Sequence, residues 1–296
     1  ASCVVLIWSG FNIVSRMAGK SALTPFDLVA LRFGVSSLIM LPFLIRRRTT
    51  LAPRQWLVVS GIGGLLYSIT IYSGFTFAPA AHAGILVNGG IPFATAMFAW
   101  VVLGFRPNRR VVMAYALTAV GIGLISIRSL MMAGTSSERW WLGDLFFIIA
   151  AMSWAFYGVL LREWKLQVVD AIAALTCGAA VVYLPLYLLF LPKSISQETW
   201  PTILLQGGYQ GIAAALGAGL GFAYATQTIG PIRASLMLAL VPGITIMMAV
   251  PLLGEPLTLV TIAGLLCVTV GAIGGAVAST PVATQSMLPH ANHDAR

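Results

Sequence analysis

The sequence predicts an all-α polytopic membrane protein with ten transmembrane helices, arranged as two inverted five-helix repeats around a central cavity. Three observations predict this fold. Of the 296 residues, 59% are hydrophobic and only 8% are charged, whereas about a quarter of the residues of a soluble protein are charged. The apolar runs are close to the length that spans a bilayer. Matching residues recur in the same order, at a nearly constant offset, in the two halves of the chain.

The apolar runs are roughly 17–27 residues long and lack the strict alternation of barrel strands, which indicates helices. In chain order, the expected helices cover residues 3–19, 28–45, 56–78, 80–105, 111–127, 144–162, 171–191, 203–228, 232–253 and 257–279. Residues 280–296 form a polar tail. Because Ala1 lies almost at the start of the first apolar run, we expect no cleavable signal peptide.

Basic residues outnumber acidic residues by 17 to 8, and most lie in short loops between the apolar runs. This placement indicates orientation in a bilayer and not binding to nucleic acid. If the N-terminus is cytoplasmic, the inner loops hold most of the basic residues, including Arg46, Arg109 and Arg162. We therefore expect both termini in the cytoplasm. Arg16 and Arg32 lie near span ends, and we expect them to extend toward the interface.

The two halves share residues at similar offsets. The matched pairs are Tyr72 and Tyr224, Thr76 and Thr228, Pro79 and Pro231, Pro92 and Pro242, Gly104 and Gly254, and Gly121 and Gly271. The expected division is a first repeat over 1–128, a connecting loop over 129–143 and a second repeat over 144–279. Because five helices is an odd number, the second copy enters the membrane with the opposite orientation, as is typical of secondary transporters. An inert duplicated scaffold is the alternative.

Several of these features resemble the drug/metabolite transporter superfamily, EamA type. They are the five-plus-five arrangement, the Trp-led first helix of each half, the sequence LLGEPLT at 252–258 and a last helix interrupted by glycines. The resemblance covers nearly the whole chain, which is most similar to the YddG aromatic amino acid exporters of bacterial inner membranes. It implies a central cavity and export of small metabolites or amino acids. One departure is LGFRPN in the first half, since only Glu255 keeps the glutamate that often follows Leu-Gly in the family.

The expected helix 80–105 carries polar and helix-weakening residues that do not suit lipid, namely His82, Asn88, Gly89, Gly90 and Pro92. Asn88 lies about 9 Å beyond His82 along the axis, at 1.5 Å per residue, which is near mid-membrane. Backbone groups freed at this depth must be buried in protein or line a wet cavity. We expect this helix to face a central pathway, and close packing against a neighbouring helix is the alternative.

Trp8 and Trp154 occupy matching places in the first helix of each half, and an inverted repeat can place them on opposite sides of one cavity. Indole offers a large apolar face and one N–H donor, although an interfacial belt is the alternative. The other candidate substrate-binding residues are Asn12, Tyr72, His82, Asn88, Tyr157, Tyr224 and Met237. Belt positions for Tyr72 and Tyr224, a structural histidine and a methionine that fills the core are open alternatives.

The expected spans carry no carboxylate in their middle, which disfavours a proton pump or an exporter of cations. They also carry few deep cations, which disfavours a phosphate substrate. A neutral or zwitterionic solute with a large apolar surface fits best, such as an aromatic or hydrophobic amino acid. Rocking around prolines would switch access to the site from one side to the other; the expected hinges are Pro79, Pro92, Pro231 and Pro242.

A broad-specificity drug or metabolite carrier is the main alternative function, and a membrane enzyme or receptor is a weaker one. The sequence has no His-Glu-x-x-His, Gly-x-Ser-x-Gly or P-loop motif, so we expect no enzyme activity. The three cysteines have no paired spacing, and we expect no metal and no cofactor. The expected partners are the small-molecule substrate and the lipid bilayer. A monomer would suffice, because both halves lie in one chain.

Overall fold

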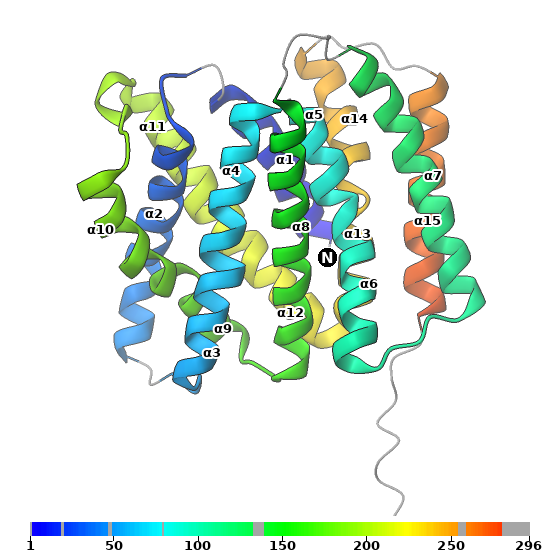
Figure 1. Ribbon diagram of the computed structural model, residues 1–296, viewed down its shortest axis with the longest axis horizontal. Coiled ribbons are helices and arrows are strands. Elements are labelled where there is room, and N and C mark those ends of the chain that lie inside the picture. The colour runs from blue at the N-terminus through cyan, green and yellow to red at the C-terminus, as the bar shows by residue number, and fades with distance from the viewer. Residues whose placement is uncertain are drawn as a thin grey trace, which may run out of the picture.

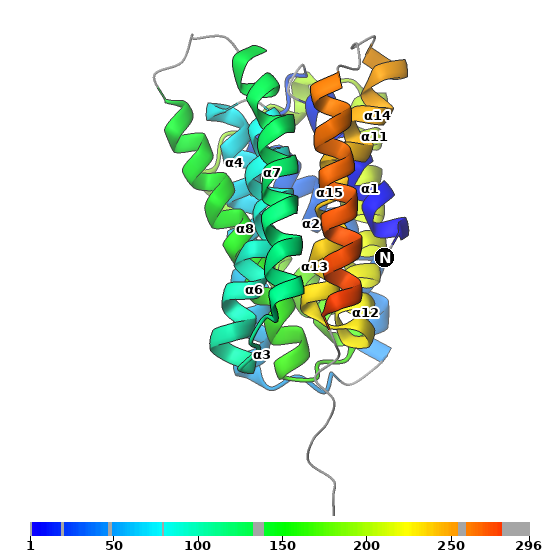
Figure 2. The same cartoon turned by 90° about the vertical axis from the view of Figure 1, so that its right-hand side faces the viewer.

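A computed structural model describes residues 2–18, 21–46, 49–78, 80–132, 139–253 and 259–279. In this part of the chain, all regular secondary structure is helical. The helices stand side by side as a bundle, and α7 (Arg109–Met132) and α15 (Leu259–Ala278) lie together at one side of it (Figures 1 and 2). Every helical range that the sequence predicts is occupied, within the described residues, by one helix or by a run of helical segments.

The first half begins with α1 and α2, continues with two runs of joined segments, and ends with α7. In chain order, the segments before α7 are α1 (Ser2–Ala18), α2 (Pro25–Arg46), α3 (Pro53–Val58), η1 (Val59–Leu66), α4 (Tyr67–Phe77), α5 (Ala80–Ala83), η2 (Gly84–Asn88) and α6 (Gly90–Leu103). The segments η1 and η2 are wider π-helical turns within their runs, a feature often found at functional sites.

The second half follows a similar order and ends with α15. The segments before α15 are α8 (Trp140–Glu163), α9 (Val168–Ala173), η3 (Ala174–Gly178), α10 (Ala179–Phe190), the short η4 (Ile195–Gln197), α11 (Trp200–Gly207), η5 (Gly208–Ala218), α12 (Gly219–Ile229), α13 (Pro231–Leu238) and α14 (Val241–Leu253). Here η3 and η5 are the π-helical turns.

The protein is a membrane protein by the length and hydropathy of its helices. Six helical runs in the described residues are long and apolar enough to cross a bilayer, namely Pro25–Arg46, Pro53–Phe77, Leu86–Leu103, Trp141–Glu163, Val168–Phe190 and Trp200–Ile229. Shorter apolar helices cover Ser2–Ser15, Pro231–Thr245 and Ile262–Ala278. Large apolar side chains on the outer surface, such as Leu38, Leu57 and Phe190, suit contact with lipid.

Helix ends differ from the apolar runs in a consistent way. Helices α2 and α3 begin at Pro25 and Pro53, a few residues before the apolar stretch, because proline is favoured in the first helical turn.

The connection between the halves is shorter than the expected 129–143, since α7 continues to Met132 and α8 begins at Trp140. No glycine or proline interrupts residues 128–132, so the helix has no reason to stop at 128.

Two of the expected helices are discontinuous. The run that starts at α5 changes from the wide turn η2 to α6 at Gly89, and the run that starts at α13 is interrupted at Ala239 and Leu240. The first interruption confirms that the helix is weakened where the sequence places its Gly-Gly pair. Gly89 and Ala239 are 150 residues apart, the same offset that separates Pro92 from Pro242. The two halves therefore break the corresponding helix at corresponding positions.

Helices α7 and α15 are held together by close backbone contact. A Cβ atom on Gly121 of α7 would lie 2.6 Å from the carbonyl oxygen of Gly264 and 2.6 Å from the amide nitrogen of Val268, both on α15. No side chain fits at this separation, so glycine is required for the approach of the two helices. Small residues serve the same purpose at many helix contacts in membranes.

The contact is reciprocal. A Cβ atom on Gly271 of α15 would lie 2.8 Å from the carbonyl oxygen of Ala114 and 2.8 Å from the amide nitrogen of Thr118. The residues in the two contacts correspond at a separation of 150 positions, in the pairs Gly121 and Gly271, Ala114 and Gly264, and Thr118 and Val268. Each helix thus presents the same surface to the other.

We predict that Gly121→Ala destabilises the protein by about 1–3 kcal/mol, because the added methyl group overpacks against the backbone of α15. Gly123→Ala is the matched control on the same helix, since a Cβ atom there meets nothing within 4 Å. Thermal unfolding of the two purified variants in detergent measures the difference. Equal melting temperatures for the two variants would show that the α7–α15 contact does not limit stability.

Candidate functional site

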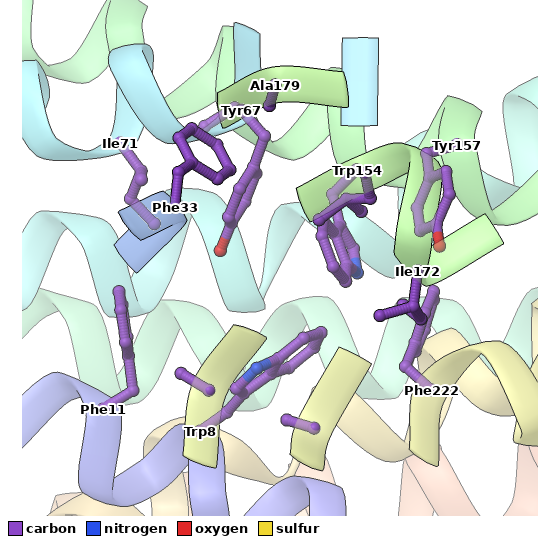
Figure 3. Close-up of a cluster of buried hydrophobic side chains, with 14 of the residues drawn as sticks. Trp8, Phe11, Phe33, Tyr67, Ile71, Trp154, Tyr157, Ile172, Ala179 and Phe222 are labelled. Atoms are coloured by element: carbon purple, nitrogen blue, oxygen red, sulfur yellow. The ribbon is translucent and has the colours of Figure 1, made fainter. Parts of the chain in front are cut away.

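Five aromatic side chains from both halves pack together inside the bundle (Figure 3). This aromatic cluster consists of Trp8, Tyr67, Trp154, Tyr157 and Phe222, and Phe11 lies in the same core against Tyr72. Trp154 is its centre, with ring centroids 4.7 Å from Tyr67, 5.3 Å from Tyr157 and 5.4 Å from Phe222. Trp154 is only 1% exposed, and it lies 14 residues beyond the start of α8. The cluster is therefore deep within the membrane-spanning part of the protein.

The structure brings the two matched tryptophans into direct contact. The ring centroids of Trp8 and Trp154 are 5.2 Å apart, and the rings meet edge to face at 71°. The sequence predicts these residues on opposite sides of one cavity, and they do come from opposite halves of the chain. Their rings touch, however, so a solute can reach the space between them only when the rings separate.

A buried polar network borders the aromatic cluster. It consists of Ser15, Arg32, Tyr72, Gln206 and Gln210, which come from α1, α2, α4, α11 and η5. The hydroxyl of Tyr72 donates to Gln210 Oε1 at 2.6 Å, and Gln210 Nε2 donates to the hydroxyl of Ser15 at 3.3 Å. Gln206 Nε2 donates to the carbonyl of Val14 at 2.9 Å. These bonds cross-link helices of both halves through the protein interior.

Arg32 connects the polar network to the aromatic cluster. The expectation that Arg32 extends to the interface is wrong, because its side chain is buried at 2% exposure. Its guanidinium lies 5.9 Å from the centre of the Tyr67 ring and beside the hydroxyl of Tyr72. Arg32 faces the interior because α2 is covered on this side by α4 and η5. The side chain of Arg16, the other expected interfacial arginine, lies outside the described residues.

Two cavities formed by described residues are lined by side chains outside the aromatic cluster. One, of about 640 Å³, is an apolar groove between α6, α7 and α8, and it is lined in part by Gly89, Gly90 and Ala151. The other, of about 340 Å³, lies at the end of α8 and includes Arg162 and Lys165. The groove therefore adjoins the discontinuity at Gly89, which the sequence predicts on the substrate pathway.

His82 pairs with a carboxylate that the sequence does not predict as its partner. Its Nδ1 atom lies 2.7 Å from Asp144 Oδ1, and this contact joins α5 to α8. Asp144 precedes Trp154 by ten residues on α8, which is about 15 Å at 1.5 Å per residue. The structure therefore places His82 near one end of the bundle and not beside the aromatic cluster.

The other predicted substrate-binding residues divide into buried and exposed groups. Asn12 is buried and donates from Nδ2 to the hydroxyl of Thr245 at 3.2 Å. Asn88 is buried in η2, and Met237 packs at the edge of the same core as the aromatic cluster. Tyr224 is 64% exposed on α12, so the structure does not bring it to the site. Its position suits the interfacial belt that the sequence left open.

Three of the predicted hinge prolines lie in the first turn of a helix. Pro231 is the first residue of α13, Pro242 is the second residue of α14, and Pro92 is the third residue of α6. Proline is well tolerated at such positions because the missing N–H has no partner there. Pro92 and Pro242 directly follow the interruptions of their helices. Pro79 lies outside the described residues.

Sequence reasoning missed the residues that join the network to the cluster, chiefly Arg32, Tyr67, Gln206, Gln210 and Phe222. Two signals were available. Arg32 is the one charge in α2 outside its first and last turns, and a charge away from the helix ends marks a functional position in a membrane protein. Gln206 and Gln210 are two amides four residues apart in an apolar run, and they therefore share one helix face. No pattern in the sequence indicates which tyrosines turn inward.

Comparisons with known proteins give a consistent result. The sequence matches the EamA-like transporter family over residues 1–127 and 141–275. It is 20% identical over 278 residues to an uncharacterized transporter of Clostridium kluyveri, with 90% of this chain and 89% of that protein covered. It is 25% identical over 285 residues to the uncharacterized transporter YyaM of Bacillus subtilis, with 89% and 87% covered. A crystal structure with 21% identity and a TM-score of 0.67, covering 93% of this chain and 94% of its own, shares the fold.

We predict that Tyr72→Phe destabilises the protein by about 1–3 kcal/mol, because the buried Gln210 Oε1 loses its donor. Tyr224→Phe is the matched control, since Tyr224 is the corresponding residue of the second half and lies on the surface. We expect that change to stay within about 0.5 kcal/mol. Unfolding in mixed micelles compares the two, and a similar loss in both variants would refute a structural role for the network.

Proposed function

Because the chain belongs to the EamA-like transporter family, we propose that it is a secondary transporter that exports aromatic or hydrophobic amino acids. The aromatic cluster is the observation that carries this proposal. It places indole and phenol rings from both halves deep in the bundle, beside a network of amide, hydroxyl and guanidinium groups. Aromatic rings favour a flat or apolar side chain, and the polar network favours the charged ends of an amino acid.

The proposed architecture is ten transmembrane helices in two inverted repeats. The reciprocal contact of α7 and α15 supports it, because a two-fold relation requires each helix to present the same surface. The contacts of α4 with α8 and of α1 with η5 form a corresponding pair, as do those of η1 with η3 and of α2 with η5. The family match also falls into two stretches of similar length, one in each half.

In the proposed mechanism, the two halves exchange conformations and expose the site to alternate sides of the membrane. The discontinuities at Gly89 and at Ala239 and Leu240 supply the flexible points, with Pro92 and Pro242 fixing the helices that follow. Separation of Trp8 from Trp154 opens the site, since these rings come from different halves. Asn12 and Met237 lie close enough to the same core to line it when open.

We further propose that the protein lies in a bacterial inner membrane with both termini in the cytoplasm. The start of α3, the connection between α6 and α7 and the connection between α8 and α9 lie at one end of the bundle (Figure 1). These segments carry Arg54, Arg106 and Lys165. Basic residues favour the cytoplasmic side, so this end faces inward. A monomer contains both halves of the site and needs no cofactor for this mechanism.

The first predicted outcome concerns substrate exchange. Liposomes containing the purified protein and loaded with unlabelled aromatic amino acids should accumulate labelled phenylalanine by counterflow. We expect Trp154→Ala to reduce the rate at least about tenfold, the effect of losing roughly 1.4 kcal/mol of binding, because Trp154 contacts four other aromatic rings. Trp100→Ala, on the exposed face of α6, should leave the rate unchanged. Absence of exchange with every amino acid would reject the proposed substrate.

The second predicted outcome concerns the contact between His82 and Asp144. If this pair closes one end of the pathway during transport, His82→Phe and Asp144→Asn should have the same effect on exchange. Each variant should lower the rate of exchange or shift the pH dependence of that rate. The double variant should then resemble either single variant, because each removes the same interaction. Transport that stays unchanged in both variants between about pH 5 and 8, the range in which histidine titrates, would exclude the pair from the mechanism.

A further inference from the structure

Arg32 is a buried charge for which the described residues provide no opposite charge. It lies seven residues beyond the start of α2, about 10 Å along the helix. Among the described residues, no carboxylate lies within ion-pairing distance of its guanidinium, and its Nε atom has no hydrogen-bond partner. Its identified neighbours are the neutral side chains of Tyr67 and Tyr72. Burying a charge without a partner costs several kcal/mol.

The buried carboxylates of α2 and α9 are committed elsewhere. Asp27 accepts hydrogen bonds from the backbone N–H groups of Thr24 and Ser194 and from the hydroxyl of Tyr187. Asp170 accepts from the backbone N–H and the hydroxyl of Thr50. Both acids stabilise the ends of helices, so neither supplies a counter-ion for Arg32.

The architecture does not require a charge at this position. Asp27 corresponds to Asp170 at a separation of 143 residues, and at the same separation Arg32 corresponds to Leu175. The backbone carbonyls of these two residues make similar contacts. Gly211 packs against the carbonyl oxygen of Arg32, and Gly64 packs against the carbonyl oxygen of Leu175. Leu175 fills its place as an ordinary buried side chain. An apolar residue therefore satisfies the packing at the corresponding position of the second half.

We infer that Arg32 binds the carboxylate of the transported solute. A guanidinium can form two parallel hydrogen bonds to a carboxylate, and its planar shape suits this geometry better than an ammonium does. The Tyr67 ring lies against both Arg32 and Trp154, so a carboxylate at Arg32 places an aromatic side chain at the cluster. This inference rests on the proposed function and deepens it, because it names the group by which the substrate is recognised.

The same geometry makes the amino group of the substrate dispensable. The aromatic cluster and the polar network hold one cation and, among their described residues, no carboxylate. An ammonium group therefore finds only neutral acceptors, such as Tyr72 and Gln210, whereas a carboxylate finds a full charge. The substrate class is then aromatic or large apolar monocarboxylates, with or without an amino group.

The test compares three solutes that differ in charge. Counterflow of labelled phenylalanine is competed by phenylalanine, by 3-phenylpropionate, which has a carboxylate alone, and by phenylalaninamide, which has an ammonium alone. We expect the two acids to compete at least tenfold better than the amide. Arg32→Gln should remove this preference, and Arg32→Lys should restore part of it. Arg54→Gln, an exposed arginine at the end of the bundle, should keep it.

A binding measurement separates this inference from the proposed function. The melting temperature of the purified protein should rise when 3-phenylpropionate is added and should not rise when phenylalaninamide is added. Arg32→Gln should abolish the rise. Without ligand, the Arg32→Gln variant should have a melting temperature equal to or above that of the unmodified protein, because an unpaired buried charge is removed. A melting temperature in this range excludes misfolding as the cause of lost binding.

The outcomes are distinct. Exchange of phenylalanine that the amide inhibits as well as the acids overturns the inference and leaves the exporter proposal intact. The inference is also overturned, and the exporter proposal left intact, if Arg32→Gln weakens competition by the acids and by phenylalaninamide equally. Absence of phenylalanine exchange, together with an Arg32-dependent thermal shift by 3-phenylpropionate, rejects amino acid export and supports the inference. If the protein shows no exchange and no thermal shift, both the exporter proposal and the inference are overturned.

Discussion

Lipid offers no hydrogen-bond partner, so each polar group within the membrane must find its partner inside the protein. Gln206 and Gln210 obey this constraint by bonding to α1 and α4, and in doing so they hold helices of both halves together. Asp27 obeys it at a helix end. Arg32 does not, because among the described residues its charge meets only neutral side chains. Trp154 Nε1 and the hydroxyl of Tyr157, in the aromatic cluster, also lack a hydrogen-bond partner among the described residues. The constraint is therefore unmet at several buried positions, and Arg32 is the one among them that carries a full positive charge.

The correspondence of the halves explains the shape of the bundle but not its site. Gly121 and Gly271 make the same contact in opposite directions, and the helices break at corresponding places. The residues beside the aromatic cluster depart from this pattern. Arg32 corresponds to Leu175, and the buried Tyr72 corresponds to the exposed Tyr224. In the proposed mechanism, the corresponding halves exchange conformations, and the residues that differ between them give the site two unlike sides.

Much of the fold could be predicted from the sequence because hydrophobic run length determines which segments lie in lipid. The interruption at Gly89 could be predicted for a different reason, because the Gly-Gly pair weakens a helix locally. The site was harder. Trp8 and Trp154 were recognised by their matched positions, but their direct contact depends on how helices pack. The partner of His82 and the inward direction of Arg32 are likewise set by neighbours distant in sequence, which periodicity within one helix does not reveal.

Under the proposed mechanism, the ring contacts within the aromatic cluster also affect which solutes are selected. Separating Trp8 from Trp154 removes an edge-to-face contact that is worth about 0.5–1.5 kcal/mol beyond the apolar area buried. A solute that inserts an aromatic ring restores ring contacts on both sides, whereas a small polar solute leaves the rings exposed to it. The free energy lost when the two rings separate is thus best compensated by a solute that carries an aromatic ring. In the proposed mechanism, packing in the closed form, and not only the lining of the open form, therefore selects solutes with an aromatic ring.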